Sequence, residues 1–395
     1  MKIGIWLGNT PQKTRGGAYS YTDRLIKLID SYDFEDLDIC FLGLHKADGG
    51  FTKEVVSISL FPDSFYKLIS KSPFLYRFAE RVDNYLLKRK GLKKILRNTD
   101  VGLVYYLTQA ICFDSNFPFI ATNWDIGHCS TYSFPEIMEN VEYRNYYYRT
   151  ILPKALMVLC DSETGKSELL KYTNIGEHKM RIFPIFAGEV SQMSLPVFKE
   201  KEILHMYGVE RNKFFFYPAQ FWAHKNHYNL LKAFLKFTEV YPDFKLVFSG
   251  SDKGNLKYIK NYVSQLGLDG KVIFLGFASL ETIYCMYSNA TSLVMASHFG
   301  PTNMPPIEAM EIGCPVVCSD LGGHREILGN SAVYFNSFKS DSIYRALIEI
   351  VENRDEFLRL LYEQKHLTEY NADKSMHKLV LHLREALEIR KNWGM

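Results

Sequence analysis

The sequence predicts an α/β protein built from two doubly wound, Rossmann-like domains. Short apolar runs alternate with helical patterns along the chain. Such runs are typical of strands in a parallel sheet that is covered on both faces. Two such series follow one another, and 395 residues are enough for two domains of roughly 150–200 residues each. Because doubly wound sheets bind ligands at the carboxyl ends of their strands, we expect a functional cleft there.

The predicted strands fall into two groups, one in each half of the chain. They cover 2–7, 37–42, 101–106, 117–121, 156–160 and 181–183, and then 214–217, 245–248, 272–275, 292–295, 316–318 and 332–334. Helical patterns such as 228–241, 255–266 and 342–353 lie between strands or after them. The stretch 187–201 has Gly, Ser, Pro and charge without a clear period. We therefore place one domain over 1–190 and another over 203–370.

The composition argues against several classes of function. Lys and Arg (47) exceed Asp and Glu (44) by +3, a surplus too small to indicate nucleic-acid binding. No apolar run approaches the roughly 18–20 residues that span a bilayer, and the N-terminal run is too short for a signal peptide. Cysteines are odd in number and several lie in apolar strands, which favours reduced thiols. We expect a cytoplasmic protein, attached at most to a membrane surface.

The segment 298–310 predicts a loop that turns abruptly into a helix. Pro305 and Pro306 fit the first helical turn, where a missing N–H costs nothing. Thr302 and Asn303, just before, are residue types that form hydrogen bonds at a helix start and leave backbone N–H groups free. Such a terminus favours a phosphate, and Glu308, about one turn further in, is placed to bond a sugar hydroxyl. A nucleotide diphosphate attached to a sugar fits this arrangement, although an ordinary capped core helix has the same pattern.

Several stretches together resemble glycosyltransferase family 4, a family of retaining enzymes with the GT-B architecture. They are 15–21, 124–128, 160–164, 217–227, 300–310, 313–317 and 322–327. The resemblance covers nearly the whole chain and implies two domains that face a central cleft, the first for the acceptor and the second for a nucleotide sugar. It also implies that a C-terminal helix over 371–395 returns to the first domain. The Gly-Pro-Thr-Asn loop resembles a subgroup found among bacterial O-antigen and capsule enzymes.

The resemblance implies a donor site in the second domain. Lys225 would neutralise the donor diphosphate, and Glu308 would bind the nucleotide ribose. Gln220 stands where the family usually has an arginine, so phosphate binding must depend on Lys225 and the helix terminus. Gly300 replaces the first glutamate of a family pair separated by seven residues. The contacts of that missing carboxylate are expected to pass to side chains and backbone amides of Thr302, Asn303 and Met304.

The candidate site residues of the first domain can each also be explained by a purely structural role. Gly16 and Gly17 offer backbone amides to the diphosphate or acceptor, or form only a strand-to-helix turn. Asp125 and His128 match a family His-Asp-x-x-His motif whose first histidine is a tryptophan here. His128 would orient a sugar hydroxyl, or it forms only local hydrogen bonds. The Asp-Ser pair at 161–162 is expected to cap the next helix, with a role in the site as the minor alternative.

The segment 65–97 combines basic and apolar residues in a helical stretch. Lys and Arg beside Phe and Leu can hold a protein on anionic lipid. The solvated face of a long helix explains the same pattern. A lipid-linked acceptor would account for it, so contact with an anionic membrane is a hypothesis that flotation tests.

The expected reaction is transfer of a hexose, with retained configuration, from a nucleoside-diphosphate sugar to a hydroxyl of a glycan or lipid-linked acceptor. The candidate catalytic residues are Lys225, Glu308, Asp125 and His128. No metal and no other cofactor is expected, because the cysteines lack zinc-site spacing. Two alternatives stay open: a GT-B enzyme that epimerises a nucleotide sugar or phosphorolyses a glycan, and a non-catalytic binder of sugar nucleotides.

Overall fold

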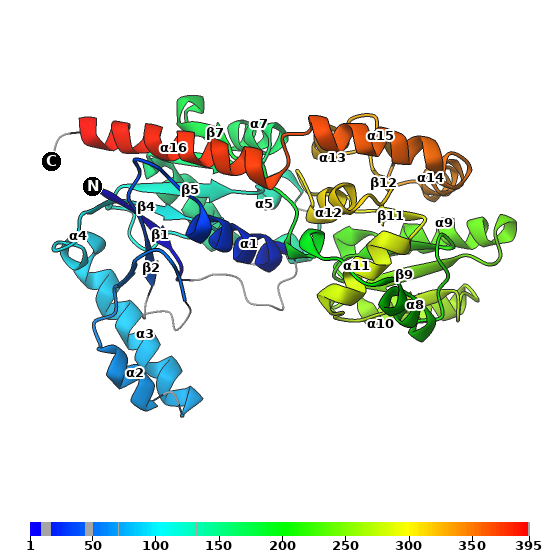
Figure 1. The fold of residues 1–395 in the computed structure, drawn as a ribbon, viewed down its shortest axis with the longest axis horizontal. Helices are drawn as coiled ribbons and strands as arrows, with labels where there is room; N and C mark the ends of the chain where they lie inside the picture. The colour runs from blue at the N-terminus through cyan, green and yellow to red at the C-terminus, as the bar shows by residue number, and fades with distance from the viewer. Residues whose placement is uncertain (9–16, 44–49, 70, 132, 139, 394–395) are drawn as a thin grey trace.

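The computed structural model describes residues 1–8, 17–43, 50–69, 71–131, 133–138 and 140–393. It contains two parallel sheets, one from each half of the chain, which lie side by side along the long axis of the molecule (Figure 1). Almost every strand is buried, as expected for parallel strands covered on both faces. The predicted pair of doubly wound, Rossmann-like domains is confirmed.

The first sheet has the strand order β3-β2-β1-β4-β5-β6-β7. Its strands are β1 (Lys2–Trp6), β2 (Ile39–Gly43), β3 (Val55–Ser57), β4 (Val101–Tyr106), β5 (Phe119–Asn123), β6 (Met157–Cys160) and β7 (Met180–Ile182). The sequence pattern missed β3, because this strand has only two valines and lies partly exposed at the sheet edge. An edge strand with so little apolar character gives almost no periodic signal.

Helices connect the strands of the first domain. They are α1 (Gly17–Ser31), α2 (Asp63–Ile69), α3 (Pro73–Lys90), α4 (Leu92–Ile95), α5 (Gly127–Ser130), α6 (Val141–Tyr146) and α7 (Glu163–Tyr172). Shorter turns are η2 (Pro135–Met138), η3 (Tyr147–Ile151), η4 (Leu152–Lys154), η5 (Glu177–Lys179) and η6 (Glu189–Gln192).

The second sheet has the order β10-β9-β8-β11-β12-β13. Its strands are β8 (Phe214–Pro218), β9 (Lys245–Ser249), β10 (Val272–Phe274), β11 (Ser292–Met295), β12 (Val316–Ser319) and β13 (Ala332–Phe335). Its helices are α8 (Val197–Met206), η7 (Ala223–Lys225), α9 (His227–Val240), α10 (Leu256–Gln265), α11 (Leu280–Asn289), α12 (Met304–Ile312), α13 (Gly322–Leu328), α14 (Ser340–Glu352) and α15 (Arg354–Leu367).

The last helix, α16 (Ala372–Asn392), crosses from the second domain to the first, along the upper side of Figure 1. It contacts β4, β7 and the segment that follows β7. Ser375 donates its hydroxyl to the Pro184 carbonyl at 2.8 Å, and Arg390 Nε donates to the Gly102 carbonyl at 3.1 Å. Glu385 forms an ion pair with Arg181. These contacts join a C-terminal segment to the first domain.

Both sheets have the same kind of switch point. The chain order reverses at β1, which lies between β2 and β4, and again at β8, which lies between β9 and β11. Loops on the two sides of such a point diverge and leave a crevice at the carboxyl ends of the strands. The crevices of the two domains face each other and define the site described below.

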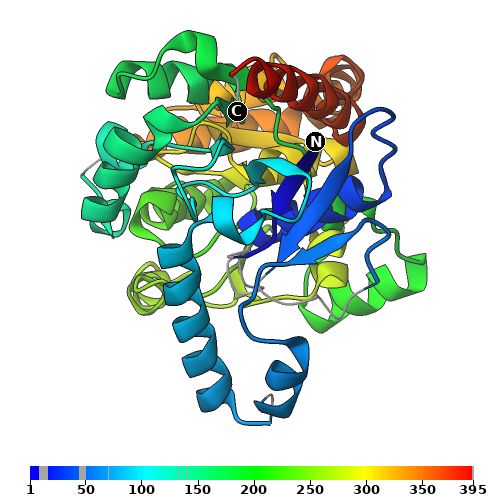
Figure 2. The same cartoon turned by 90° about the vertical axis from the view of Figure 1, so that its left-hand side faces the viewer.

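Helices α2 and α3 form a hairpin that projects from the first domain (Figure 2). Asp83 is 1% exposed and holds the base of the hairpin together. Its carboxylate accepts hydrogen bonds from the Ser59 hydroxyl at 2.5 Å, the Leu60 amide at 2.9 Å and the Tyr66 hydroxyl at 2.9 Å. The basic segment is therefore two antiparallel helices plus α4, and not the single long helix that its spacing suggested.

Candidate active site

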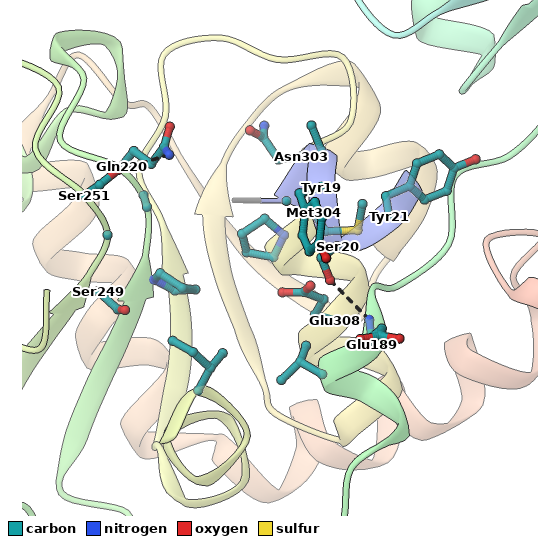
Figure 3. Close-up of a pocket in the computed structure, with 18 of the residues that line it drawn as sticks. Tyr19, Ser20, Tyr21, Glu189, Gln220, Ser249, Ser251, Asn303, Met304 and Glu308 are labelled. Atoms are coloured by element: carbon teal, nitrogen blue, oxygen red, sulfur yellow. Dashed lines mark hydrogen bonds between the residues drawn. The ribbon is translucent and has the colours of Figure 1, made fainter. Parts of the chain in front are cut away.

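A cavity of about 800 Å³ opens between the two domains at their switch points. The start of α1, Trp124, Asp161 and η6 line it from the first domain. The ends of β8 and β9, Lys225 and the start of α12 line it from the second. Figure 3 shows Tyr19, Ser20, Met304 and Glu308 on one side, with Gln220, Ser249 and Ser251 across the gap.

The tip of α12 lies at this cavity, and its two prolines occupy the first helical turn as predicted. Thr302 and Asn303 do not act as the capping side chains that the sequence suggested. The Thr302 hydroxyl donates to Asp161 Oδ2 at 2.6 Å, and Asn303 bonds Lys225 and His324. Pro305 and Pro306 have no N–H, so this helix start offers an anion in the cavity the backbone amides of Asn303 and Met304 together with the positive end of the helix dipole.

Lys225 follows β8 in the short turn η7 and reaches toward the loop before α12. Its Nζ donates to Asn303 Oδ1 at 2.9 Å and lies 3.5 Å from Ser297 Oγ. Burial lowers the pKa of Lys225 to about 8, although the Asp125 carboxylate acts in the opposite direction. The structure thus brings Lys225, Asn303 and Met304 together at one end of the cavity.

Glu308 is 8% exposed and lies on the cavity side of α12. Its Oε2 accepts a hydrogen bond from the Tyr287 hydroxyl at 2.8 Å. Burial raises the pKa of Glu308 to about 7, and hydrogen bonds from Tyr287 and the Gly188 backbone oppose that shift. A carboxylate in this position can accept hydrogen bonds from hydroxyl groups of a ligand.

Of three further predicted residues, Gln220 and Gly17 line the cavity, and Gly300 lies next to Asn303 in the loop before α12. The Gln220 amide bonds Ser251 Oγ at 3.2 Å and the Trp222 indole at 3.0 Å. Gly17 begins α1, and a Cβ there would come within 3.3 Å of Met304, so the starts of α1 and α12 lie close together. Gly300 has φ of 129° and supplies the turn before Asn303. Gly16 lies outside the described residues.

The structure does not bring Asp125 and His128 into the cavity lining; Trp124 is the member of that motif that reaches it. Asp125 pairs with Arg144 at 2.7 Å. Burial alone would raise its pKa, but Arg144 and hydrogen bonds hold the pKa of Asp125 below its usual value. His128 packs beside Tyr148, and burial lowers its pKa to about 4. Among the described residues, neither ring nitrogen of His128 has a hydrogen-bond partner.

Asp161 is a cavity residue that the sequence analysis treated mainly as a helix cap. Ser162 performs that capping, since its hydroxyl oxygen accepts from the Gly165 amide at 2.9 Å. Asp161 is 3% exposed, lines the cavity and accepts the Thr302 hydroxyl from the other domain. Burial raises its pKa to about 7. The signal available in the sequence was a carboxylate directly after the strand β6.

Two more contacts hold the domains together beside the cavity. Glu326 of α13 accepts from the amides of Glu163 and Thr164, at 2.8 and 2.9 Å, at the start of α7. On the other side, Glu136 accepts from the His224 amide at 2.9 Å and approaches His224 Nδ1 at 3.0 Å. The cavity therefore lies between two cross-domain links.

Comparison with known proteins gives the family of the second domain. Residues 201–372 match the family model described as glycosyl transferases group 1. This part of the chain is a group 1 glycosyl transferase domain. All of the cavity residues of the second domain, Lys225, Asn303 and Glu308 among them, lie within these matched residues.

The chain is 26% identical over 241 residues to the O-antigen chain mannosyltransferase RfbU of Salmonella typhimurium. That match covers 61% of this chain and 63% of the relative, which is less than two thirds of its length.

Two solved structures have a similar fold. Sucrose-phosphate synthase from Thermosynechococcus elongatus has a TM-score of 0.73 and 16% identity, covering 98% of this chain and 99% of the other. Alr3699/HepE of Anabaena, solved in complex with UDP-glucose, has a TM-score of 0.67 and 17% identity, covering 98% of this chain and 100% of the other. This likeness confirms the GT-B fold. The assignment to family 4 and its Gly-Pro-Thr-Asn subgroup stays a prediction.

Proposed function

We propose that the chain is a retaining glycosyltransferase that moves a hexose from a nucleoside-diphosphate sugar to a hydroxyl of a glycan or lipid-linked acceptor. The observation that carries this proposal is a single cavity at both switch points, where Lys225 meets the tip of α12. The group 1 glycosyl transferase domain supports it, and so does the likeness to an O-antigen mannosyltransferase. Surface-polysaccharide synthesis is the setting we propose.

In the proposed reaction the donor diphosphate binds at the tip of α12. The backbone amides of Asn303 and Met304, the positive end of the α12 dipole and the Lys225 ammonium stabilise negative charge that grows on the leaving diphosphate. The leaving phosphate oxygen takes the proton of the acceptor hydroxyl on the same face, so no protein nucleophile is needed. Glu308 accepts hydrogen bonds from the ribose hydroxyls. Closure of the two domains over the cavity would limit access of water, and with it hydrolysis of the donor.

The acceptor belongs, in this proposal, on the wall formed by the first domain. Tyr19, Tyr21 and Trp124 line that wall, and aromatic rings offer flat apolar surfaces to a sugar. Asp161 and His128 are then candidates for orienting sugar hydroxyls, Asp161 because it lines the cavity. His128 would need to move to reach it.

The test is a transfer assay with a panel of nucleoside-diphosphate hexoses, mannosyl donors included, and a lipid-linked saccharide. We expect a new glycosidic bond with retained anomeric configuration, and no donor turnover when the acceptor is omitted. Epimerised donor in the acceptor-free sample would identify an epimerase. Donor binding in a thermal-shift panel without turnover on any acceptor would identify a binding subunit.

We also propose that the transfer needs no metal, because Lys225 and the helix tip supply the positive potential. Among the described residues, no group of three or more His, Cys, Asp or Glu side chains is arranged to hold a metal ion. Activity should survive EDTA. Loss of activity that a divalent cation restores would contradict this part of the proposal.

The α2–α3 hairpin is the surface that we propose for contact with anionic lipid. Leu68 and Phe74 are each 77% exposed, and Phe78 and Tyr85 are also exposed. Exposed basic side chains accompany them at Lys71, Arg81, Lys88, Arg89, Lys90, Lys93, Lys94 and Arg97. Apolar side chains beside Lys and Arg match the two components of an anionic membrane surface. Among the described residues, no helix has the length and apolar character to cross a bilayer.

Vesicle flotation tests the hairpin. Binding should require phosphatidylglycerol, fall with salt, and be lost when Leu68, Phe74 and Phe78 are all changed to serine. Phe198→Ser is the matched control, because Phe198 is 66% exposed on α8 of the other domain. Equal binding to neutral and anionic vesicles, or equal loss in the control, would end the membrane proposal.

A further inference from the structure

His324 lies behind the cavity, on the far side of Asn303. It is 0% exposed and belongs to α13, whose first residues Gly322 and Gly323 were part of the sequence motif without a role. A Cβ at Gly323 would overlap the Pro301 carbonyl oxygen. The glycine therefore lets the start of α13 lie directly against the 300–303 loop, and His324 follows it into that contact.

The hydrogen bonds of His324 determine which ring nitrogen carries the proton. Nδ1 lies 2.8 Å from the Ser319 carbonyl oxygen. A carbonyl only accepts, so Nδ1 is the protonated nitrogen and Nε2 is an acceptor. Nε2 lies 3.0 Å from Asn303 Nδ2, which must therefore donate to it.

This contact sets the orientation of the Asn303 amide. With Nδ2 directed to His324, Oδ1 points to Lys225 Nζ at 2.9 Å. An ammonium group has donors only, so the opposite amide orientation would face Lys225 with another donor. The chain Ser319–His324–Asn303–Lys225 is thus directional, and each member has one compatible orientation.

We propose that His324 is a positioning residue of the donor site: by fixing the Asn303 amide, it holds the Lys225 ammonium at the tip of α12 for the donor diphosphate. The inference rests on the proposed function. A neutral amide oxygen holds the ammonium without cancelling its charge, which a carboxylate in its place would do. His324 itself is uncharged at working pH, because burial lowers its pKa to about 4.

Two amides of different length test this role. His324→Gln places an oxygen near the position of Nε2 and can still accept from Asn303, whereas His324→Asn is too short to reach it. We expect the donor KM to stay within about 3-fold of wild type in the Gln variant. In the Asn variant it should rise by roughly 10-fold to 100-fold, because the Asn303 oxygen no longer holds its hydrogen bond to the charged Lys225. His382→Asn is the control, because His382 bonds the Ile182 carbonyl at 2.9 Å in the first domain.

The pH profile separates positioning from a general loss of structure. The titratable groups that act on Lys225 are Asp125, His224, His227 and His324. The three histidines are neutral above pH 6, so the alkaline limb of kcat/KM for the donor follows Lys225. In His324→Asn that limb should move down by about one pH unit. A purely structural defect would lower the rate equally at every pH.

A double-mutant cycle completes the test. If His324 acts through Asn303, adding His324→Asn to Asn303→Ala should cost nothing further. Additive losses, or a wild-type donor KM and alkaline limb in His324→Asn, would overturn the inference. If the wild-type chain transfers no sugar and binds no donor, the proposed function itself fails, and this outcome is distinct from the other two. If His324→Asn does not fold, the donor KM and the pH profile of His324→Gln are compared with those of wild type instead, and this comparison tests the inference.

Discussion

Lys225 lies where burial disfavours its positively charged form. Burial lowers its pKa to about 8, and the Asn303 oxygen binds the ammonium without neutralising it. The stabilisation that such a charge provides is largest when negative charge grows on a leaving diphosphate. We predict that Lys225→Ala lowers transfer by at least roughly 10²-fold, measured as kcat/KM for the donor. Lys257→Ala, at an exposed position on α10, should leave it unchanged; near-normal turnover in the Lys225 variant would remove this residue from the site.

Glu308 and Lys225 together predict the pH dependence of the free enzyme. Burial raises the pKa of Glu308 to about 7, so its carboxylate is lost as the pH falls below that value. Lys225 loses its charge as the pH rises through about 8. The kcat/KM profile should therefore be bell-shaped with its maximum between these values.

Two variants at Glu308 check the acid limb of that profile. Glu308→Ala should lower transfer by at least roughly 10²-fold. Glu308→Gln keeps one acceptor and should shift or flatten the acid limb. An unchanged acid limb in the Gln variant would assign it to another group, and Asp161, with a pKa also raised by burial to about 7, would be tested next.

Helix α7 is stabilised by a side chain from the other domain. The first N–H groups of a helix have no partner within the helix, and two of those of α7 donate to the Glu326 carboxylate of α13. The same carboxylate also accepts from the Thr164 hydroxyl at 2.7 Å and from the Tyr370 hydroxyl. Negative charge at this end of a helix is favourable as well.

We predict that Glu326→Ala lowers the free energy of unfolding by about 1–3 kcal/mol, the usual loss when bonded donors are left unsatisfied. Urea unfolding followed by circular dichroism measures this change. Glu349→Ala, at an exposed position on α14, serves as the control and should have almost no effect. Equal stability of both variants would show that water replaces Glu326 at the start of α7.

The same elements show how far the sequence could be taken. Apolar runs located every strand except β3, and the proline pair located the start of α12, because these signals depend on local pattern alone. The partner of Thr302 is 141 residues away in sequence, across the cleft. No local pattern contains such a pairing, and Asp161 was for that reason treated mainly as a cap. Asp125 and His128 were predicted for the site but do not line the cavity; Asp125 pairs with Arg144 and His128 packs beside Tyr148, contacts that no local pattern contains either.

At the scale of the molecule, the contacts between the two domains lie around the cavity and leave its interior open. Glu136 meets His224 at one side, Asp161 meets Thr302 at the cavity wall, and Glu326 meets α7. A Cβ at Gly127 would overlap the Phe299 ring, so the two domains also approach closely there. These contacts join the two halves of the proposed site.

The buried histidines determine how the whole molecule responds to acid. Burial lowers the pKa to about 3 for His227, which packs against Phe221, and to about 4 for His128, His224 and His324. In the unfolded chain each would titrate near 6.5. Between about pH 6.5 and 4 the unfolded state therefore binds more protons, and the stability falls as the pH decreases. Asp161 and Glu308, whose pKa values are raised, act in the opposite direction, but they are fewer.

We predict that His227→Phe reduces the loss of stability between pH 8 and pH 5 by about 2 kcal/mol. Phenylalanine can replace the imidazole among the rings of Tyr217, Phe221 and Phe248, and it has no proton to take up on unfolding. Urea unfolding at both pH values measures the difference. His205→Gln is the control, since His205 is exposed on α8 and its loss should leave the pH dependence unchanged. A His227→Phe variant with the wild-type pH dependence would mean that His227 takes up its proton as readily in the folded protein as in the unfolded chain, and that burial among these rings does not keep it neutral.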